Sequence, residues 1–282
     1  MEKSLLHRET RTRKRWAIIS SFSLVISVVF LILCELGTTS SSRLPNVYFI
    51  KLDLSNIIPT SVPNYSLINT IAQTLGLHDY YQVGLWNYCA ANNGEGIVEC
   101  SKPKTLFWFN PIAVIQSELL SGATIAFPTE IQNVLHILKT ASQWMFGLFL
   151  TAVVLDFVMI FITPLALYSK LLSLPIAIFS FLSALVTTVA AILGTVIFVI
   201  FRNAARAQTN LNIGANIGSE MFAFMWIAAG FSLFSFLIQM SLLCCCRSRR
   251  KAKKEWRKRH ANSVNGSDKE KDDASPQRSS MT

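Results

Sequence analysis

The chain has 282 residues, of which 51% are hydrophobic and only 15% are charged, yet its formal net charge is +10. Soluble globular proteins usually carry about 25% charged residues, so this chain is poor in charge while remaining basic. The high apolar content disfavours a disordered chain, and the scarcity of charge disfavours an ordinary nucleic-acid-binding domain. Separation of apolar and basic residues along the chain, as in a membrane protein, explains both values.

Four apolar segments have the length needed to cross a bilayer, about 20 residues of helix. Helix is expected because lipid offers no partners to open backbone groups. The segments are 16–33, 144–168, 174–201 and 221–243. A signal peptide is an alternative for the first segment, but its apolar run exceeds the usual core of about 7–15 residues. Pro164 and Pro175 flank the connection between the second and third segments and indicate a tight hairpin.

The distribution of Lys and Arg predicts the orientation of these segments. Residues 1–15 form a basic N-terminus, and a second basic cluster opens the segment 244–282. By the positive-inside rule, both termini face the cytoplasm. Residues 34–142 then form a large outer loop and residues 202–220 a small one. Two arginines in the small loop oppose the rule but are outnumbered.

Cys89 and Cys100 lie in the large outer loop, where oxidation is permitted. They enclose the run 92–96, Asn-Asn-Gly-Glu-Gly, which is typical of a turn. We therefore expect a hairpin closed by a disulfide, which would contribute roughly 2–3 kcal/mol through loop entropy. Two free buried cysteines are the alternative. A zinc site is disfavoured because no histidines accompany the pair.

The rest of the large loop predicts a small β-rich unit followed by a helix. The runs 47–54 and 80–88 are rich in β-branched and aromatic residues and predict strands. Apolar residues at helical spacing in 131–138 predict a helix that continues into the second span. We expect the aromatic side chains of the loop to pack in a core or anchor at the membrane surface rather than bind a ligand.

The string Gly84-Leu85-Trp86, followed by Cys89 and Cys100, resembles the signature of the claudin superfamily, where it lies in the first outer loop of a four-span protein. Together with the downstream string Phe107-Trp108-Phe109-Asn110-Pro111, it resembles the fungal claudin-like SUR/PalI family, which includes PalI and eisosome-associated four-span proteins. The resemblance covers most of residues 15–245. It implies an all-α membrane protein, a four-helix transmembrane bundle with a small, disulfide-bearing, partly β extracellular domain. The outer loop is longer than in claudins proper, which argues against tight-junction behaviour.

Asp156 lies near the middle of the second apolar segment, where an ionised carboxylate costs roughly 2.5–3.5 kcal/mol. It is expected to face other helices as a polar staple; a proton- or ion-responsive site is the alternative. The hydroxyls at similar depth belong to Thr187, Thr188, Ser232 and Ser235. A stripe of small residues in the third segment predicts close helix packing, within the chain or between copies. The stripe consists of Ser180, Ala184, Thr188, Ala191 and Thr195.

The region after the fourth segment carries signals for the membrane surface. Cys244, Cys245 and Cys246 are candidates for S-palmitoylation. Nine basic residues follow and predict contact with anionic inner-leaflet lipids at roughly 1 kcal/mol per charge. They are Arg247, Arg249, Arg250, Lys251, Lys253, Lys254, Arg257, Lys258 and Arg259. The polar remainder predicts disorder. Asn64 begins the sequon in an outer loop and is a candidate for N-glycosylation.

The sequence contains no nucleophile–base pair, phosphate-binding loop or metalloprotease motif. We therefore expect a protein that is not an enzyme and that binds no cofactor or metal. The resemblance implies a multi-pass plasma-membrane organiser of eisosome or cortical-domain type, linked to cell wall integrity, endocytosis or membrane compartments. An accessory of ambient-pH signalling, as PalI, is the alternative. A transporter or channel is less favoured because no span is broken. Expected partners are the bilayer, related four-span proteins or further copies, and cell-wall or cortical proteins, but not nucleic acid.

Overall fold

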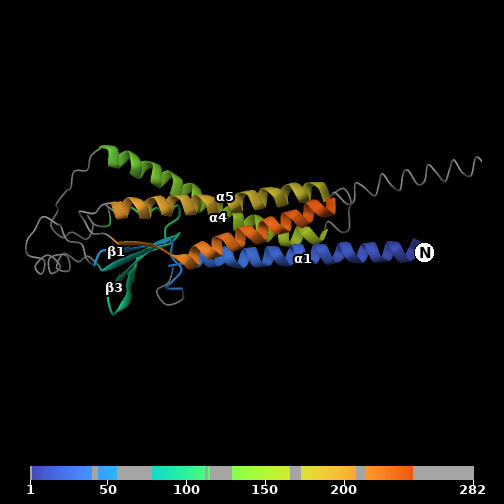
Figure 1. Cartoon of the computed structure of the whole chain (residues 1–282), viewed down its shortest axis with the longest axis horizontal. Coiled ribbons are helices and arrows are strands. Elements are labelled where there is room, and N and C mark those ends of the chain that lie inside the picture. Colours follow the sequence, from blue (N-terminus) through green and yellow to red (C-terminus); the bar gives the residue numbers. More distant parts are fainter. Residues whose placement is uncertain are drawn as a thin grey trace, which may run out of the picture.

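The computed structural model describes residues 2–39, 44–55, 78–111, 114, 129–165, 173–207 and 214–243. Within them, four long helices form a bundle: α1 (Glu2–Leu36), α4 (Thr129–Leu165), α5 (Ser173–Ala207) and a helix over Ser219–Leu243, here named the fourth span. Each contains a stretch long and apolar enough to cross a membrane. The four predicted apolar helices are therefore present, and they lie alongside one another in Figure 1.

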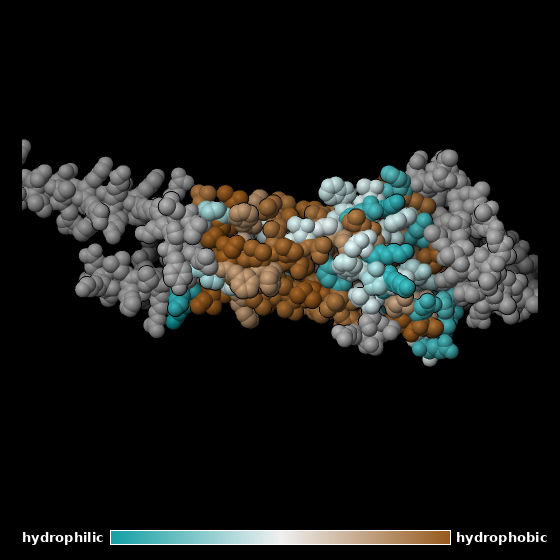
Figure 2. All heavy atoms as spheres, turned by 180° about the vertical axis from the view of Figure 1, so that it is seen from behind, coloured by the Kyte–Doolittle hydropathy of each residue, from teal (hydrophilic) through white to brown (hydrophobic). Residues whose placement is uncertain are grey.

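The bundle places small residues inside and large apolar residues outside. Ala152 of α4, Ala191 of α5 and Ala228 of the fourth span are fully buried, whereas Phe22 and Phe161 are largely exposed. This arrangement suits a hydrocarbon solvent, because small side chains let helices approach closely while large ones face lipid. Figure 2 shows the result as a continuous hydrophobic band over the helices, with hydrophilic residues gathered at the sheet end.

A five-stranded antiparallel sheet lies at one end of the bundle (Figure 1), with the strand order β4-β3-β2-β1-β5. Its strands are β1 (Ile50–Asp53), β2 (Tyr80–Val83), β3 (Tyr88–Asn92), β4 (Gly96–Cys100) and β5 (Gly214–Ile217). Next to the edge strand β5, Ile50 of β1 pairs with Val83 of β2 on one side and with Ile217 of β5 on the other. The sheet therefore joins the two predicted loops into one unit.

The expectation of one strand over 80–88 was wrong, because this run forms β2 and β3 with a tight turn between them. The backbone N–H of Gly84 donates to the carbonyl of Asn87 at 2.9 Å and closes the turn. The Asn87 side chain is completely buried in the turn and bonded there. An aromatic-rich run predicts extended backbone, but this turn depends on contacts with residues distant in sequence.

The segment 202–220, predicted as a short outer loop, contains regular structure that the sequence did not indicate. Helix α5 continues to Ala207, and β5 then adds to the edge of the sheet beside β1. The guanidinium of Arg206 donates to the carbonyl of Ala215 and to the side chain of Asn216, both at 2.9 Å. This clasp gives Arg206, one of the two arginines that oppose the positive-inside rule, a structural role. The predicted helix over 131–138 does continue into the second span, as α4.

Aromatic packing fixes the sheet to α4 and α5. Phe49, just before β1, stacks face to face on Phe198 of α5 with ring centroids 4.5 Å apart. Its other neighbour is Phe149 of α4, at 6.4 Å. Because all these rings are buried or nearly so, one hydrophobic core extends from the sheet into the bundle.

Candidate functional site

The predicted hairpin and its disulfide are present. Cys89 of β3 pairs directly with Cys100 of β4, and their sulfurs are bonded. At the tip, Gly94 and Gly96 adopt positive φ angles of 87° and 77°, which glycine accepts without strain. The hairpin is therefore closed at its base by a covalent bond and at its tip by residues suited to the turn.

The Gly84-Leu85-Trp86 string forms the turn that docks the sheet on the end of α1. A Cβ atom at Gly84 would lie 1.6 Å from the Oγ1 of Thr38, so only glycine fits. Thr38, two residues after the end of α1, itself has a positive φ of 59°. Leu85 is almost fully buried beside these residues. The string thus brings the backbone at Gly84 close to Gly37 and Thr38, where the first span meets the sheet.

Trp86 ties two spans together at this boundary. Its indole N–H donates to the carboxylate of Glu35 at the end of α1, at 2.8 Å. Its ring meets the edge of Phe146 on α4, with centroids 4.6 Å apart. Sequence reasoning missed Glu35, although an acidic residue at the very end of an apolar segment was a signal for such a contact.

Asn87 and Cys89 complete the enclosure of Thr38. The Asn87 amide donates to the carbonyl of Ser101 at 3.1 Å and accepts from the Thr38 hydroxyl at 3.3 Å. The Cys89 sulfur lies 3.1 Å from the Thr38 carbonyl oxygen. Gly84, Trp86 and Cys89 of the predicted string therefore all contact the residues that follow α1 or end it.

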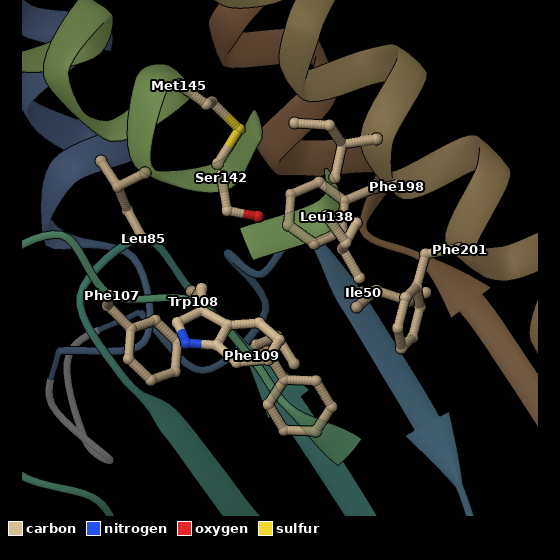
Figure 3. Close-up of a pocket in the computed structure, with 13 residues that line it drawn as sticks. Ile50, Leu85, Phe107, Trp108, Phe109, Leu138, Ser142, Met145, Phe198 and Phe201 are labelled. Carbon is tan, nitrogen blue, oxygen red and sulfur yellow. The ribbon is translucent and has the colours of Figure 1, made fainter. Parts of the chain in front are cut away.

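The Phe107-Trp108-Phe109 string lines a small hollow between the sheet and helices α4 and α5. Figure 3 shows the three rings below Ser142 and Met145 of α4, with Phe198 and Phe201 of α5 beside them. The hollow measures about 20 Å³, which is room for little more than a water molecule. Packing, rather than binding of an organic ligand, is what this string provides. The adjoining Asn110 carbonyl accepts from the N–H of Val114, and Pro111 lies between them.

Two further glycines bring the fourth span against the sheet. A Cβ at Gly218 would lie 1.8 Å from the carbonyl oxygen of Tyr48, and one at Gly37 would lie 2.7 Å from a Met221 side-chain carbon. Burial raises the pKa of Tyr48, and the nearby carboxylate of Glu220 raises it further. The ends of α1 and the fourth span that lie at the sheet are therefore fixed to the chain segment that leads into β1.

Asp156 is fully buried in the bundle and bonds to one serine from each of the other three spans. Ser27 of α1 lies 2.6 Å from Oδ2, and Ser232 of the fourth span lies 3.1 Å from Oδ1. Ser183 of α5 also bonds to Oδ1. We name these four residues the Asp156 cluster.

The hydroxyls expected near Asp156 were only partly the right ones. Ser232 does bond to it, but Thr187 and Thr188 donate to carbonyls of their own helix, and Ser235 bonds to Ser20. Ser27 and Ser183 were missed. Ser183 lies one turn before Thr187 on the same face, so residue depth alone could not separate the two.

The Asp156 cluster lies at the middle of the membrane-spanning region. Nine residues of helix separate Ser27 from Leu36, a rise of about 13 Å, which is near half of a 30 Å hydrocarbon core. Trp16 on one side and Trp144 on the other are 46% and 67% exposed. Both lie about 16–18 Å along their helices from the cluster, where tryptophans mark the membrane surface.

The small-residue stripe of α5 lies within the chain's own bundle. Ser180, Ala184 and Ala191 are buried. Thr195 donates to the carbonyl of Ala191 and accepts from the Trp226 indole of the fourth span at 3.2 Å. The stripe thus provides close packing between spans of one chain.

A family model described as the SUR7/PalI family matches residues 16–238. The chain belongs to the SUR7/PalI family. The match extends from the start of the first span almost to the end of the fourth and includes both cysteines of the hairpin. As a member of the SUR7/PalI family with four candidate spans, it is a multi-pass membrane protein with a claudin-like fold.

Two fungal members of the SUR7/PalI family are similar over most of their length. Protein PUN1 of Saccharomyces cerevisiae is 27% identical over 249 residues, covering 81% of this chain and 89% of that protein. SUR7 family protein pun1 of Schizosaccharomyces pombe is 24% identical over 252 residues, covering 74% and 86%. The likeness therefore concerns the whole four-span unit and not a single segment.

Several predicted sites lie outside the described residues: the sequon at Asn64, the cysteines 244–246 and the basic cluster 247–259. Their roles in this SUR7/PalI family member stay predictions. Within the described ranges, no three His, Cys, Asp or Glu side chains come together in a group that could hold a metal ion.

Proposed function

We propose that the protein is a non-enzymatic organiser of the plasma membrane, of eisosome or cortical-domain type. Both termini face the cytoplasm and the sheet faces outward. The observation that supports this most is the direct attachment of the sheet to the spans through Trp86, Glu35 and the Thr38 enclosure. Because the sheet and bundle share one core, a contact made by the sheet also positions the bundle in the membrane.

The mechanism combines three kinds of contact. The sheet contacts cell-wall or cortical components, the lipid-facing surface contacts related four-span proteins or further copies, and the basic cluster 247–259 contacts anionic inner-leaflet lipids. Palmitoyl chains on Cys244–Cys246 would add a second membrane attachment beside the fourth span. Each contact is individually weak, and together they hold the protein in one patch of membrane.

Live imaging of a tagged chain beside an eisosome marker tests this function. Clustered, immobile fluorescence at the cell cortex that overlaps the marker is the expected result. A uniformly mobile or purely internal signal would contradict the proposal. Neutralising the nine basic residues to Gln should disperse the clusters, whereas Gln at Lys269 and Lys271, farther along the tail, should leave them intact.

A second function, an accessory of ambient-pH signalling, is favoured by the family description, which names PalI. In that role the protein helps a pH sensor reach the cell surface. A strain that lacks the protein should then fail to grow at alkaline pH. In the same strain, other four-span proteins should still form normal clusters at the cell cortex. Normal alkaline growth would remove this function.

A further inference from the structure

The Asp156 cluster contains four close oxygen–oxygen contacts. Three join Asp156 to Ser27, Ser183 and Ser232. The fourth joins the Ser27 hydroxyl to the carbonyl oxygen of Ala228, on the fourth span, at 3.0 Å. Every one of these contacts is buried in the bundle.

The number of protons decides how these contacts are made. Each hydrogen bond needs one proton, and the three serine hydroxyls supply only three for the four contacts. An ionised Asp156 accepts only, so Ser27 would have to divide one proton between Asp156 and Ala228. A protonated Asp156 supplies the fourth proton. Its Oδ2–H then donates to Ser27, Ser27 donates to Ala228, and the other two serines donate to Oδ1.

The charge around the cluster leads to the same conclusion. In the described parts of the spans, the nearest titratable side chains lie toward the helix ends. On α1 they are Arg15 and Cys34, on α4 Lys139, on α5 Arg202 and on the fourth span Glu220. No cation therefore faces Asp156 from any of the three helices packed against it, and a buried ionised carboxylate without a partner is strongly unfavourable.

We propose that the Asp156 cluster is a proton-binding site, in which the neutral acid donates from Oδ2 to Ser27 and joins all four spans in one hydrogen-bonded chain. The ligand is a single proton, held at the middle of the membrane-spanning region. The site goes beyond the proposed organising function because it concerns how the bundle is closed, whatever the sheet or tail contacts.

Infrared spectroscopy of the purified full chain in lipid vesicles at neutral pH tests the proposal directly. A neutral carboxylic acid has a C=O stretching band at higher frequency than carboxylate or amide bands. We expect this band in the wild type, its loss in Asp156→Asn, and no change to it in Glu35→Gln, the control at a partly buried carboxyl. If the wild type shows no acid band, or if its acid band persists unchanged in Asp156→Asn, the proposal is overturned.

Thermal unfolding in the same vesicles gives a second readout. Asn resembles the protonated acid, with an N–H toward Ser27 and an oxygen for Ser183 and Ser232. We therefore expect the unfolding midpoint of Asp156→Asn to fall only slightly below that of the wild type. The midpoint of Asp156→Leu should fall much further, because leucine has a similar size but no polar side-chain atoms. Equal falls in the two variants would mean that the charge, not the proton, holds the helices, and would overturn the proposal.

The Ser27→Ala variant keeps the test decisive even if variants at Asp156 do not fold. It removes the acceptor of the proposed Asp156 proton but leaves both donors to Oδ1. The acid band should persist and move to higher frequency, because its O–H loses its partner. A band that stays in place would show that Oδ2 does not donate to Ser27.

Discussion

Gly84 occupies a position that a larger residue cannot share. A Cβ atom there would lie 1.6 Å from the Thr38 hydroxyl and 2.9 Å from the carbonyl oxygen of Gly37. We expect Gly84→Ala to destabilise the protein by about 1–3 kcal/mol, as overpacking usually does. The thermal unfolding midpoint of the purified protein measures the effect.

Gly230 provides the matched control for Gly84. It lies in the fourth span with open space where its Cβ would be, and alanine is favoured over glycine in helices by about 0.8–1 kcal/mol. Gly230→Ala should therefore unfold at or above the wild-type midpoint. A midpoint equally low in both variants would mean that the contact with Thr38 does not matter.

At this scale the sequence indicated the important residues but not their contacts. Gly84, Trp86 and Cys89 were singled out by their string, and the structure brings all three to the end of α1. Their neighbours Glu35 and Thr38 lie about fifty residues away in sequence. No local pattern reports such a contact, because it depends on how the sheet meets the first span.

The β3–β4 hairpin depends on its disulfide, since β4 is an edge strand with largely exposed residues. Replacing Cys89 and Cys100 together with Ala should cost roughly 2–3 kcal/mol, because the short loop regains its freedom in the unfolded chain. A reductant should lower the midpoint of the wild type to that of the double variant. It should leave the double variant itself unchanged, and a similar fall in both would contradict this assignment.

Elements were predictable where hydrophobic length or turn chemistry is decisive. The four apolar helices and the Asn-Gly hairpin follow from such patterns. The division of 80–88 into two strands and the presence of β5 do not. β5 is a four-residue run, Gly214–Ile217, that is stabilised by pairing with β1 and by the Arg206 clasp rather than by its own propensity.

Glycosylation tests the orientation of the whole molecule. If residues 34–142 face outward, the sequon at Asn64 is exposed to the glycosylation machinery, while the sequon at Asn265 stays in the cytoplasm. Glycosidase treatment should increase the gel mobility of the wild type and of Asn265→Gln, but not that of Asn64→Gln. A glycan on Asn265 would reverse the proposed topology.

Helix α4 is one unbroken helix of 37 residues, about 55 Å long. Since Asp156 lies at mid-membrane, almost half of α4 projects beyond the hydrocarbon at the sheet end, where Leu138, Ser142 and Met145 face the Phe107–Phe109 string. The sheet consequently stands at a set height above the lipid and turns only when the bundle turns. Copies gathered side by side would present their sheets in a shared orientation, so that a lateral arrangement in the bilayer becomes a repeating pattern at a fixed distance from it.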